Sequence, residues 1–357
     1  MGRVSYVSRE EVQDAFDVRE AAHRSDQIDA AIRSASDDID GWLKRHKHGL
    51  APRIATRYFR WPTQDYSPAW KLWLDENELV SVTTLTAGGT AIASGDYFLE
   101  PVNSGPPYTY IEIDLDSSAS FTNSGTSQRA IEIVGTWGIN DDQVTAGALA
   151  EALDSSETAV DVTNASLVGV GDVLLVDSER MLVTGRSTLD TGQNLASNMN
   201  ALKNDQTVDV QSGAALFVGE VILIENERMK ITEITGNNAT VIRAYDGTTL
   251  AAHTSPLDVY AYRTLTVERG ALGSTAATHS TAAAITKWDV PSLVRDLCKA
   301  TAITRIEQEW SAYGGRVYSD EAERDSSGTE VVAGRGLTDL RKSCVRRYGR
   351  KFRKAAI

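Results

Sequence analysis

A repeated segment near the middle of the chain constrains the fold more than any other sequence feature. Residues 171–184 (GDVLLVDSERMLVT) match residues 219–232 (GEVILIENERMKIT) without a gap, at an offset of 48 positions. A second pair of segments, 241–253 and 267–279, matches at an offset of only 26 positions. Two different offsets are incompatible with a simple tandem repeat. We therefore expect two related units that do not simply follow one another.

Nesting of one unit inside the other explains both offsets. One complete β unit (about 206–261) would be inserted in a loop of another, whose halves are about 156–187 and 262–286. Strand pairing tolerates such an insertion because the entropic cost of closing a loop grows only slowly with its length. Apolar and polar residues alternate within each unit, which predicts a small barrel or sandwich.

The repeat also duplicates charged residues and a histidine. The charged residues at equivalent positions are Glu179, Arg180, Glu227 and Arg228. Adjacent residues of a strand point to opposite faces, so we predict turn and surface charges here rather than a joint acid–base site. His253 and His279 are equivalent as well. Their duplication predicts a repeated structural hydrogen bond rather than a metal site.

Composition separates the repeated region from its flanks. All seven tryptophans lie outside residues 138–287, which predicts a distinct inserted module. The net charge of the 357-residue chain is -13, which disfavours nucleic-acid binding by the chain as a whole. Its two cysteines, Cys298 and Cys344, cannot form a disulfide framework and suit a reducing compartment. The sequence shows neither a signal peptide nor an apolar run of the roughly 20 residues that cross a bilayer.

The segment before the module begins with two helical patterns and continues with strands. Ser8 and Glu11 form a capping box at the start of the first helix. Apolar residues at helical spacing predict a second helix over about 25–46. Short runs between residues 56 and 137 predict strands, with a hairpin turn at Gly88-Gly89.

The segment after the module combines a long helix with a basic end. Pro291 suits the first turn of a helix that is predicted to reach about Tyr313. A stretch rich in Gly, Ser and acidic residues (314–336) predicts a mobile loop. Residues 335–357 then hold nine basic side chains and a single acidic one, Asp339.

The basic end also carries an apolar stripe, which a free solvated tail would not need. We therefore expect it to dock on an acidic protein surface or to face a phosphate backbone. The candidate docking and DNA-channel residues are Leu337, Leu340, Arg341, Lys342, Arg346, Arg347, Tyr348, Arg350, Lys351, Arg353 and Lys354.

Motifs for catalysis or cofactor binding are missing from the sequence. It contains no P-loop, dinucleotide fingerprint, nucleophile elbow or zinc motif. We therefore expect no catalytic residue, no cofactor and no bound metal.

A series of short motifs runs through the two flanks. They are Val7-Ser8-Arg9-Glu10-Glu11-Val12, the helix Asp26 to Trp42, Thr56-Arg57-Tyr58-Phe59, Leu72-Trp73-Leu74, Glu78-Leu79-Val80-Ser81-Val82-Thr83, Gly88-Gly89-Thr90, Asp96-Tyr97-Phe98-Leu99 and Ile133-Val134-Gly135-Thr136-Trp137-Gly138. In this order they resemble the head–tail connector (adaptor) proteins of long-tailed bacteriophages. In that family a Gly-x-Trp-Gly strand is followed almost directly by a Pro-initiated helix. Here Val290-Pro291 follows an insertion of about 150 residues.

The resemblance implies an α+β fold, namely a helical connector core with a small β-sheet and hairpin region, to which the inserted all-β domain of two nested repeats is added. The expected domains are the connector core (1–139), the inserted duplicated β domain (140–288), a long helix with its mobile loop (289–334) and the basic portal-docking helix and tail (335–357).

The resemblance also implies a structural virion protein without enzymatic activity. Such an adaptor forms a ring of about twelve copies under the portal, joins the capsid to the tail and lines the DNA exit channel. The implied partners are the portal protein, neighbouring copies, the next neck or tail-completion protein and, transiently and non-specifically, channel DNA. No membrane is implied, and the expected location is the virion neck, after synthesis in the host cytoplasm.

An alternative is a peripheral virion protein whose duplicated β domain binds another virion protein or a host-surface ligand. A glycan binder would expose aromatic side chains for stacking on sugar rings. The inserted domain has no Trp and few other aromatic residues, which disfavours a glycan ligand.

Overall fold

The computed structural model describes residues 4–15, 25–45, 49–62, 67–310 and 335–350. It divides into two compact units. The first unit consists of residues 1–39, 143–271 and 275–342, and the second unit of residues 40–142, 272–274 and 343–357. The N-terminal helical segment therefore groups with the β module and not with residues 40–142.

The described residues contain four α-helices. They are α1 (Arg9–Ala15), α2 (Ser25–Trp42), α3 (Ser292–Trp310) and α4 (Arg335–Tyr348). The predicted capping box is present, because Ser8 Oγ accepts a hydrogen bond from the Glu11 N–H and Glu11 Oε2 accepts one from the Ser8 N–H. Residues 314–334 of the predicted mobile loop lie outside the described residues. None of the helices described is both long and apolar enough to span a membrane.

Helices α2 and α3 bury their apolar stripes within the first unit. Ile28 and Ile32 of α2 are at most 2% exposed, and Leu297 and Ile306 of α3 are at most 1% exposed. Ser36 Oγ and Cys298 Sγ lie 3.5 Å apart and join the two helices. The apolar residues recur every three or four positions, so each helix presents one continuous buried face.

Ten strands of the first unit form one antiparallel sheet. They are β8 (Gln143–Ala148), β9 (Ala159–Asp161), β10 (Val173–Val176), β11 (Glu179–Asn194), β12 (Thr207–Asp209), β13 (Val221–Ile224), β14 (Glu227–Thr235), β15 (Asn238–Ile242), β16 (Asp258–Glu268) and β17 (Ala284–Trp288).

This sheet closes on itself twice and forms two small barrels. In the outer barrel the strand order is β8-β17-β10-β11-β16-β9, and a bridge between Leu149 and Val162 closes the ring. In the inner barrel the order is β11-β16-β13-β14-β15-β12, and the closing bridge joins Leu195 to Val210. Closure leaves neither barrel with a free edge strand.

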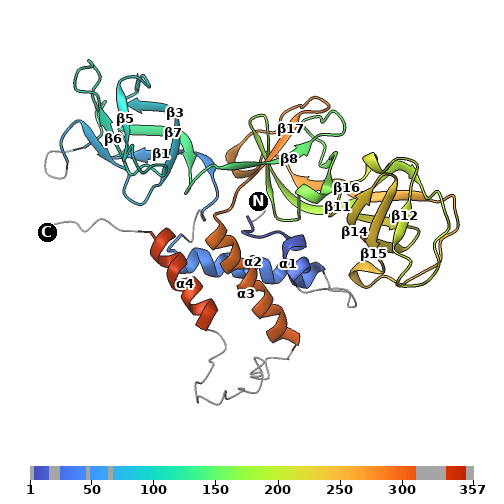
Figure 1. The fold of residues 1–357 in the computed structure, drawn as a ribbon. Helices are drawn as coiled ribbons and strands as arrows, with labels where there is room; N and C mark the ends of the chain where they lie inside the picture. Colours follow the sequence, from blue (N-terminus) through green and yellow to red (C-terminus); the bar gives the residue numbers. More distant parts are fainter. Residues whose placement is uncertain (1–3, 16–24, 46–48, 63–66, 311–334, 351–357) are drawn as a thin grey trace, which may run out of the picture. The chain divides into compact units, whose positions relative to one another are not determined.

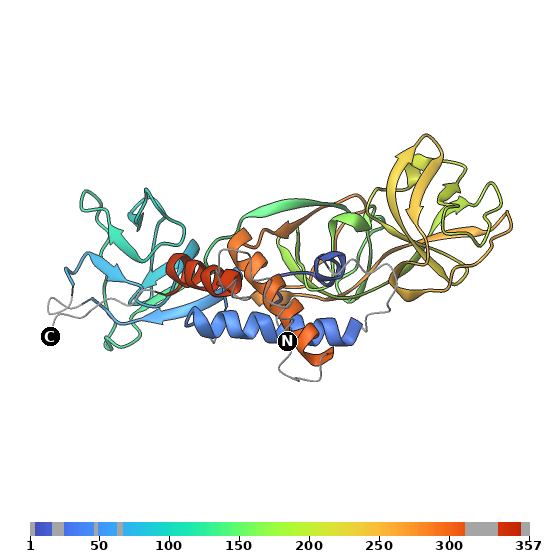
Figure 2. The same cartoon turned by 60° about the horizontal axis from the view of Figure 1, so that its bottom comes forward.

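The barrels are nested in the way that the two offsets predicted. Strands β11 and β16 are long and belong to both barrels, since they pair from Leu182↔Glu268 in the outer barrel to Asn194↔Asp258 in the inner one. Figures 1 and 2 show this ribbon running between the barrels from two directions. The short 3-10 helices repeat too, Ala165–Leu167 with Gly213–Ala215 and Tyr245–Gly247 with Ala271–Gly273.

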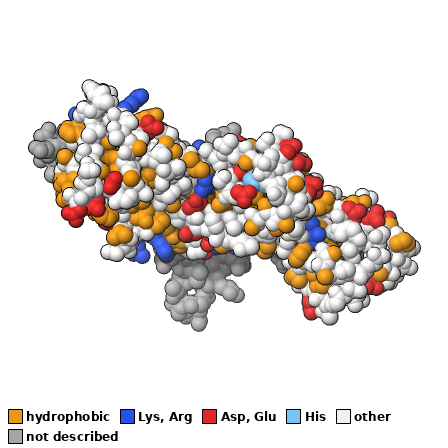
Figure 3. Space-filling model, turned by 90° about the horizontal axis from the view of Figure 1, so that it is seen from above, with side chains coloured by type: hydrophobic (Ala, Val, Ile, Leu, Met, Phe, Trp, Pro, Cys, Tyr) orange, Lys and Arg blue, Asp and Glu red, His pale blue; other side chains and the backbone are white. Residues whose placement is uncertain are grey.

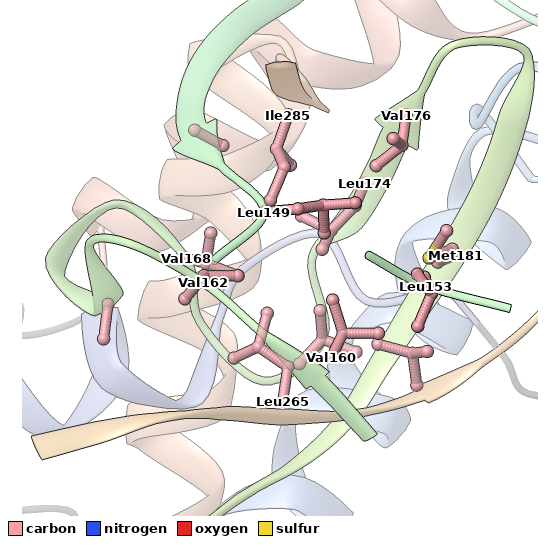
Figure 4. Packing of buried hydrophobic residues seen from close by; sticks show 14 of the residues in the cluster. Leu149, Leu153, Val160, Val162, Val168, Leu174, Val176, Met181, Leu265 and Ile285 are labelled. Atoms are coloured by element: carbon pink, nitrogen blue, oxygen red, sulfur yellow. The ribbon is translucent and has the colours of Figure 1, made fainter. Parts of the chain in front are cut away.

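Each barrel has its own apolar core. The outer core combines residues 146–183 with 265–285, and Figure 4 shows its side chains, among them Leu149, Leu174 and Leu265, converging inside the barrel. The inner core is built only from residues 195–261. The chain thus completes the inner barrel before it returns to finish the outer one.

The second unit is also mainly β. Its strands are β1 (Arg53–Phe59), β2 (Lys71–Trp73), β3 (Leu79–Ala87), β4 (Thr90–Ile92), β5 (Tyr97–Glu100), β6 (Tyr110–Ile113) and β7 (Ile131–Trp137). They form a four-stranded sheet, β1-β7-β3-β4, and a three-stranded sheet, β2-β6-β5. Trp137 is 2% exposed, stacks on Phe59 and donates Nε1–H to the carbonyl of Ala55.

The prediction of a helical connector core is wrong. About 37% of the described residues are in strands and only 22% in helices, and large antiparallel sheets dominate both units. The reason is that residues 53–137 alternate with a period of two and close their own apolar core around Trp137 and Ile111, so they need no helical layer. The apolar faces of α2 and α3 are instead buried within the first unit.

Excision of the inner barrel tests the nesting. Asp190 and Tyr260 are register partners, so an Asn-Gly turn in place of residues 191–259 connects β11 and β16 as a hairpin. Arg263, which loses its partner Glu220, is replaced by Gln. We expect one cooperative thermal transition with β-type circular dichroism, because the buried outer core is intact. Non-cooperative unfolding would contradict nesting, and excision of residues 158–187 serves as the disruptive control.

Candidate functional site: a basic helix and buried charge networks

The predicted docking residues lie on opposite sides of α4. Cys344 is fully buried, and Leu337, Leu340 and Tyr348 are partly buried. The exposed side carries the cations Arg341, Lys342, Arg346 and Arg347. Burial in this apolar contact raises the pKa of the Cys344 thiol to about 11. Lys351, Arg353 and Lys354 lie outside the described residues.

The C-terminal end of α4 is anchored in the second unit by Arg45. This guanidinium is 2% exposed and donates from Nε and Nη2 to the carbonyl of Tyr348, at 3.2 and 2.9 Å. Its charge is balanced by Glu78, which it contacts through both terminal nitrogens. Gly349 follows the last residue of the helix, and the position requires glycine because a Cβ there would lie 2.3 Å from the Val345 carbonyl oxygen. A buried cation thus satisfies carbonyl oxygens that the helix end leaves open.

The cationic face of α4 contrasts with the barrels. Residues 140–288 carry 19 acidic and 9 basic side chains. Acidic groups are scattered over the barrels in Figure 3, which shows one face of the molecule. The local positive charge of α4 is therefore distinct from the negative charge of the chain as a whole.

A second feature, which sequence reasoning missed, is a buried charge network in the outer barrel. Glu179 begins β11 and is inaccessible to solvent. Arg269 donates Nε and Nη2 to its two carboxylate oxygens at 2.7 and 2.8 Å. His279 places Nε2 2.9 Å from Glu179 Oε2 and Nδ1 2.7 Å from Asp177 Oδ2. The backbone N–H groups of Gly270 and Ala277 complete the contacts of the carboxylate.

The inner barrel repeats this network position for position, with Glu225 in place of Asp177. Glu227 accepts two hydrogen bonds from Arg243, at 2.7 and 2.8 Å. His253 lies between Glu227 and Glu225, with its ring nitrogens 2.9 and 2.8 Å from their oxygens. The remaining guanidinium protons of Arg243 go to the carbonyls of residues 200, 205 and 251. Each network therefore ties the end of one loop to the first residue of a strand.

The two glutamates keep their charge although they are buried. Burial alone would raise the pKa of Glu179, but the hydrogen bonds from Arg269, His279 and the backbone outweigh it and lower the pKa to about 2. The pKa of Glu227 is lowered to about 2 for the same reasons, with Arg243 and His253 as the donors. Both carboxylates are therefore ionised at neutral pH.

The networks correct one sequence prediction and confirm another. Glu179, Arg180 and Glu227 are not turn and surface charges, because they are at most 4% exposed, whereas the Arg228 side chain is 37% exposed. The alternation of side chains along a strand led to the prediction that these charges are exposed. The glutamates are buried because a later segment of each unit supplies their partners, Arg269 and Arg243. The repeated structural hydrogen bond expected of His253 and His279 is confirmed. Among the described residues, no group of His, Cys, Asp and Glu is arranged to hold a metal ion.

A third feature is a hollow of about 300 Å³ between α1 and the strands of both barrels. Its charged groups neutralise one another in pairs. Arg186 donates to Glu10 at 3.1 Å, and Lys230 pairs with Asp14. Glu10 also accepts the backbone N–H of Val170 at 2.8 Å. These contacts hold α1 on the β module. The hollow is therefore explained by the packing of α1 against the barrels.

Comparison of the chain with protein-family models, with curated proteins and with solved structures gives no match.

The structural role of the networks is tested by Glu227→Gln. The substitution leaves Arg243 buried without its carboxylate, and breaking a buried pair in this way costs about 3–5 kcal/mol in the free energy of unfolding. Glu225→Gln is the matched control, because Glu225 contacts the same histidine but its side chain is 51% exposed, so a loss below about 1 kcal/mol is expected. Urea unfolding measures both. Equal losses would contradict the account.

Acid stability follows from the lowered carboxylate pKa values. The folded-state pKa of Glu179 and Glu227 is about 2, against an ordinary value of 4.5 in the unfolded chain. Their contribution is therefore complete above pH 4.5 and is lost as the pH falls towards 2. We expect thermal stability to decrease over this window, and to decrease less steeply in the Glu179→Gln/Glu227→Gln variant. Parallel pH profiles for the two proteins would refute this assignment.

Proposed function

We propose that the chain is a structural virion protein, the head-to-tail adaptor that lies in a ring of about twelve copies between portal and tail, in the neck of the particle. The observation that carries the proposal is α4, a helix with an apolar inner side and the exposed cations Arg341, Lys342, Arg346 and Arg347. Support also comes from the series of flanking motifs that resembles connector proteins. The proposal does not require a helical core, which the described residues do not show.

The geometry of α4 suits docking better than a solvated tail would. Arg45 holds its C-terminal carbonyl, and Leu340 and Cys344 face inward, so the cations project from a fixed helix. A helix that is already anchored loses little backbone freedom on binding, and its cations accelerate encounter with an acidic surface. The proposed partners are the portal protein first, neighbouring copies and the next neck protein, with non-specific contacts to DNA in the channel.

Charge removal on α4 tests the docking role. Gln at Arg341, Lys342, Arg346 and Arg347 should weaken binding to the cognate portal about 100-fold, at roughly 0.7 kcal/mol for each rim cation. The same change in net charge at Arg33, Arg60, Arg129 and Lys203, which are exposed elsewhere, should leave binding within about threefold. Binding is measured by biolayer interferometry at two salt concentrations.

The outcomes separate a docking helix from general electrostatics. Equal weakening by the two sets of substitutions would mean that only net charge matters, and unchanged binding by the α4 variant would refute the docking role. Truncation before Gly336 should abolish portal binding while the thermal transition of the barrels stays in place.

A further inference from the structure

Three arginines of the second unit contact the turn between β2 and β3. Three consecutive side chains of this turn each contact a different guanidinium. Glu78 is bound by Arg45, Asn77 Oδ1 accepts from Arg57 Nη1 at 2.6 Å, and Glu76 Oε2 lies 3.5 Å from Arg350 Nη1. The arginines come from the segment after α2, from β1 and from the residues after α4.

The turn holds three carboxylates, Asp75, Glu76 and Glu78, but few of them form close ion pairs with the arginines. Only Arg45 has a close two-point partner, Glu78. The central contact of Arg57 is with a neutral amide, whose own Nδ2 donates to the Leu74 carbonyl and thereby directs the oxygen towards the guanidinium. Glu76 is 60% exposed and lies at the outer limit of an ion pair. Across the residues that the structure describes, no carboxylate pairs with Arg57.

Arg57 is held in place by contacts that leave its charge uncompensated. Its guanidinium carbon lies 4.3 Å from the ring centroid of Trp137, and the side chain is half-buried. Burial, followed by the positive charges of Arg350 and Arg53, lowers the pKa of Arg57 to about 10. Like charges held together in a half-buried site destabilise the fold unless an anion joins them.

Arg350, like Arg57, has no close two-point partner among the described residues. Its Nε is buried and has no hydrogen-bond acceptor within the described part of the chain. A buried donor left without an acceptor costs about 1–3 kcal/mol, so its persistence calls for an explanation. The side chain as a whole is 17% exposed, so solutes can reach part of it, although the Nε itself is buried.

We infer that Arg57 and Arg350, beside the β2–β3 turn, bind one phosphate group, either free or in the backbone of a nucleic acid. Guanidinium groups offer paired N–H donors that match phosphate oxygens. The oxygens of a phosphate point in different directions, so one group can accept from the terminal nitrogens of both arginines. Its charge of up to two matches the two cations. This inference does not depend on the proposed function.

Calorimetric titration of the full chain with inorganic phosphate tests the site, with acetate at equal ionic strength as the carboxylate probe. We expect saturable binding of one phosphate per chain, and acetate should bind at least tenfold more weakly. The absence of saturable phosphate binding, or tighter binding of acetate, would overturn the inference whatever the variants do.

Two substitutions locate the binding. Arg57→Gln and Arg350→Gln should each weaken phosphate binding about tenfold, the cost of one charge-assisted hydrogen-bond pair. Arg129→Gln, an equal charge change at an exposed side chain outside the proposed site, should have no effect. Equal affinity in all of these proteins would place the ion elsewhere and overturn the assignment. Arg350 follows the last helix, so its variant keeps the core around Trp137 even where Arg57→Gln perturbs it.

A labelled DNA duplex distinguishes the two sources of phosphate. If the site takes backbone phosphate, Arg350→Gln weakens duplex binding in a fluorescence anisotropy titration, and inorganic phosphate competes with the duplex. If it takes the free ion, inorganic phosphate binds but duplex affinity is unchanged by the substitution. Both results support phosphate chemistry, and they differ only in where the group comes from.

Discussion

The pairing of β11 with β16 is the interaction on which the rest of the first unit depends. The two strands run antiparallel through both barrels, from Leu182↔Glu268 to Asn194↔Asp258. One end of this ribbon contributes Val183 and Leu265 to the outer core, and the other contributes Val259 and Ala261 to the inner core. Each barrel closes only because the ribbon supplies it with two strands. A duplicated unit could therefore be inserted without opening its host.

The Glu–Arg–His networks hold a loop of each barrel against the first residue of a strand. In each barrel a buried carboxylate receives a bidentate arginine, a histidine and two backbone N–H groups, so its hydrogen-bonding capacity is filled. A fully satisfied network specifies one loop geometry, whereas apolar packing alone would allow several. The close duplication of the network shows that it belongs to the unit itself.

The sequence predicted the elements better than the architecture. The four helices were recognised because Ser8 caps α1 and apolar residues recur at helical spacing, and the nesting was recognised because two offsets cannot coexist in a tandem array. The charge networks were missed because Glu179 and Arg269 are 90 positions apart, and local alternation says nothing of such partners. The prediction of a helical core was wrong because it relied on the resemblance to connector proteins, in which α2 and α3 would dominate the fold. The exposed and buried sides of α4 match the stripes read from its sequence, but the anchoring by Arg45 could not be read from either segment alone.

The adaptor proposal rests most directly on assembly, so the decisive measurement is the native mass of the purified chain, alone and with its portal protein, by mass photometry. The account predicts a monomer that becomes a ring of about a dozen copies on the portal. A chain that stays monomeric and does not respond to the portal would contradict the adaptor role and favour a peripheral binding protein.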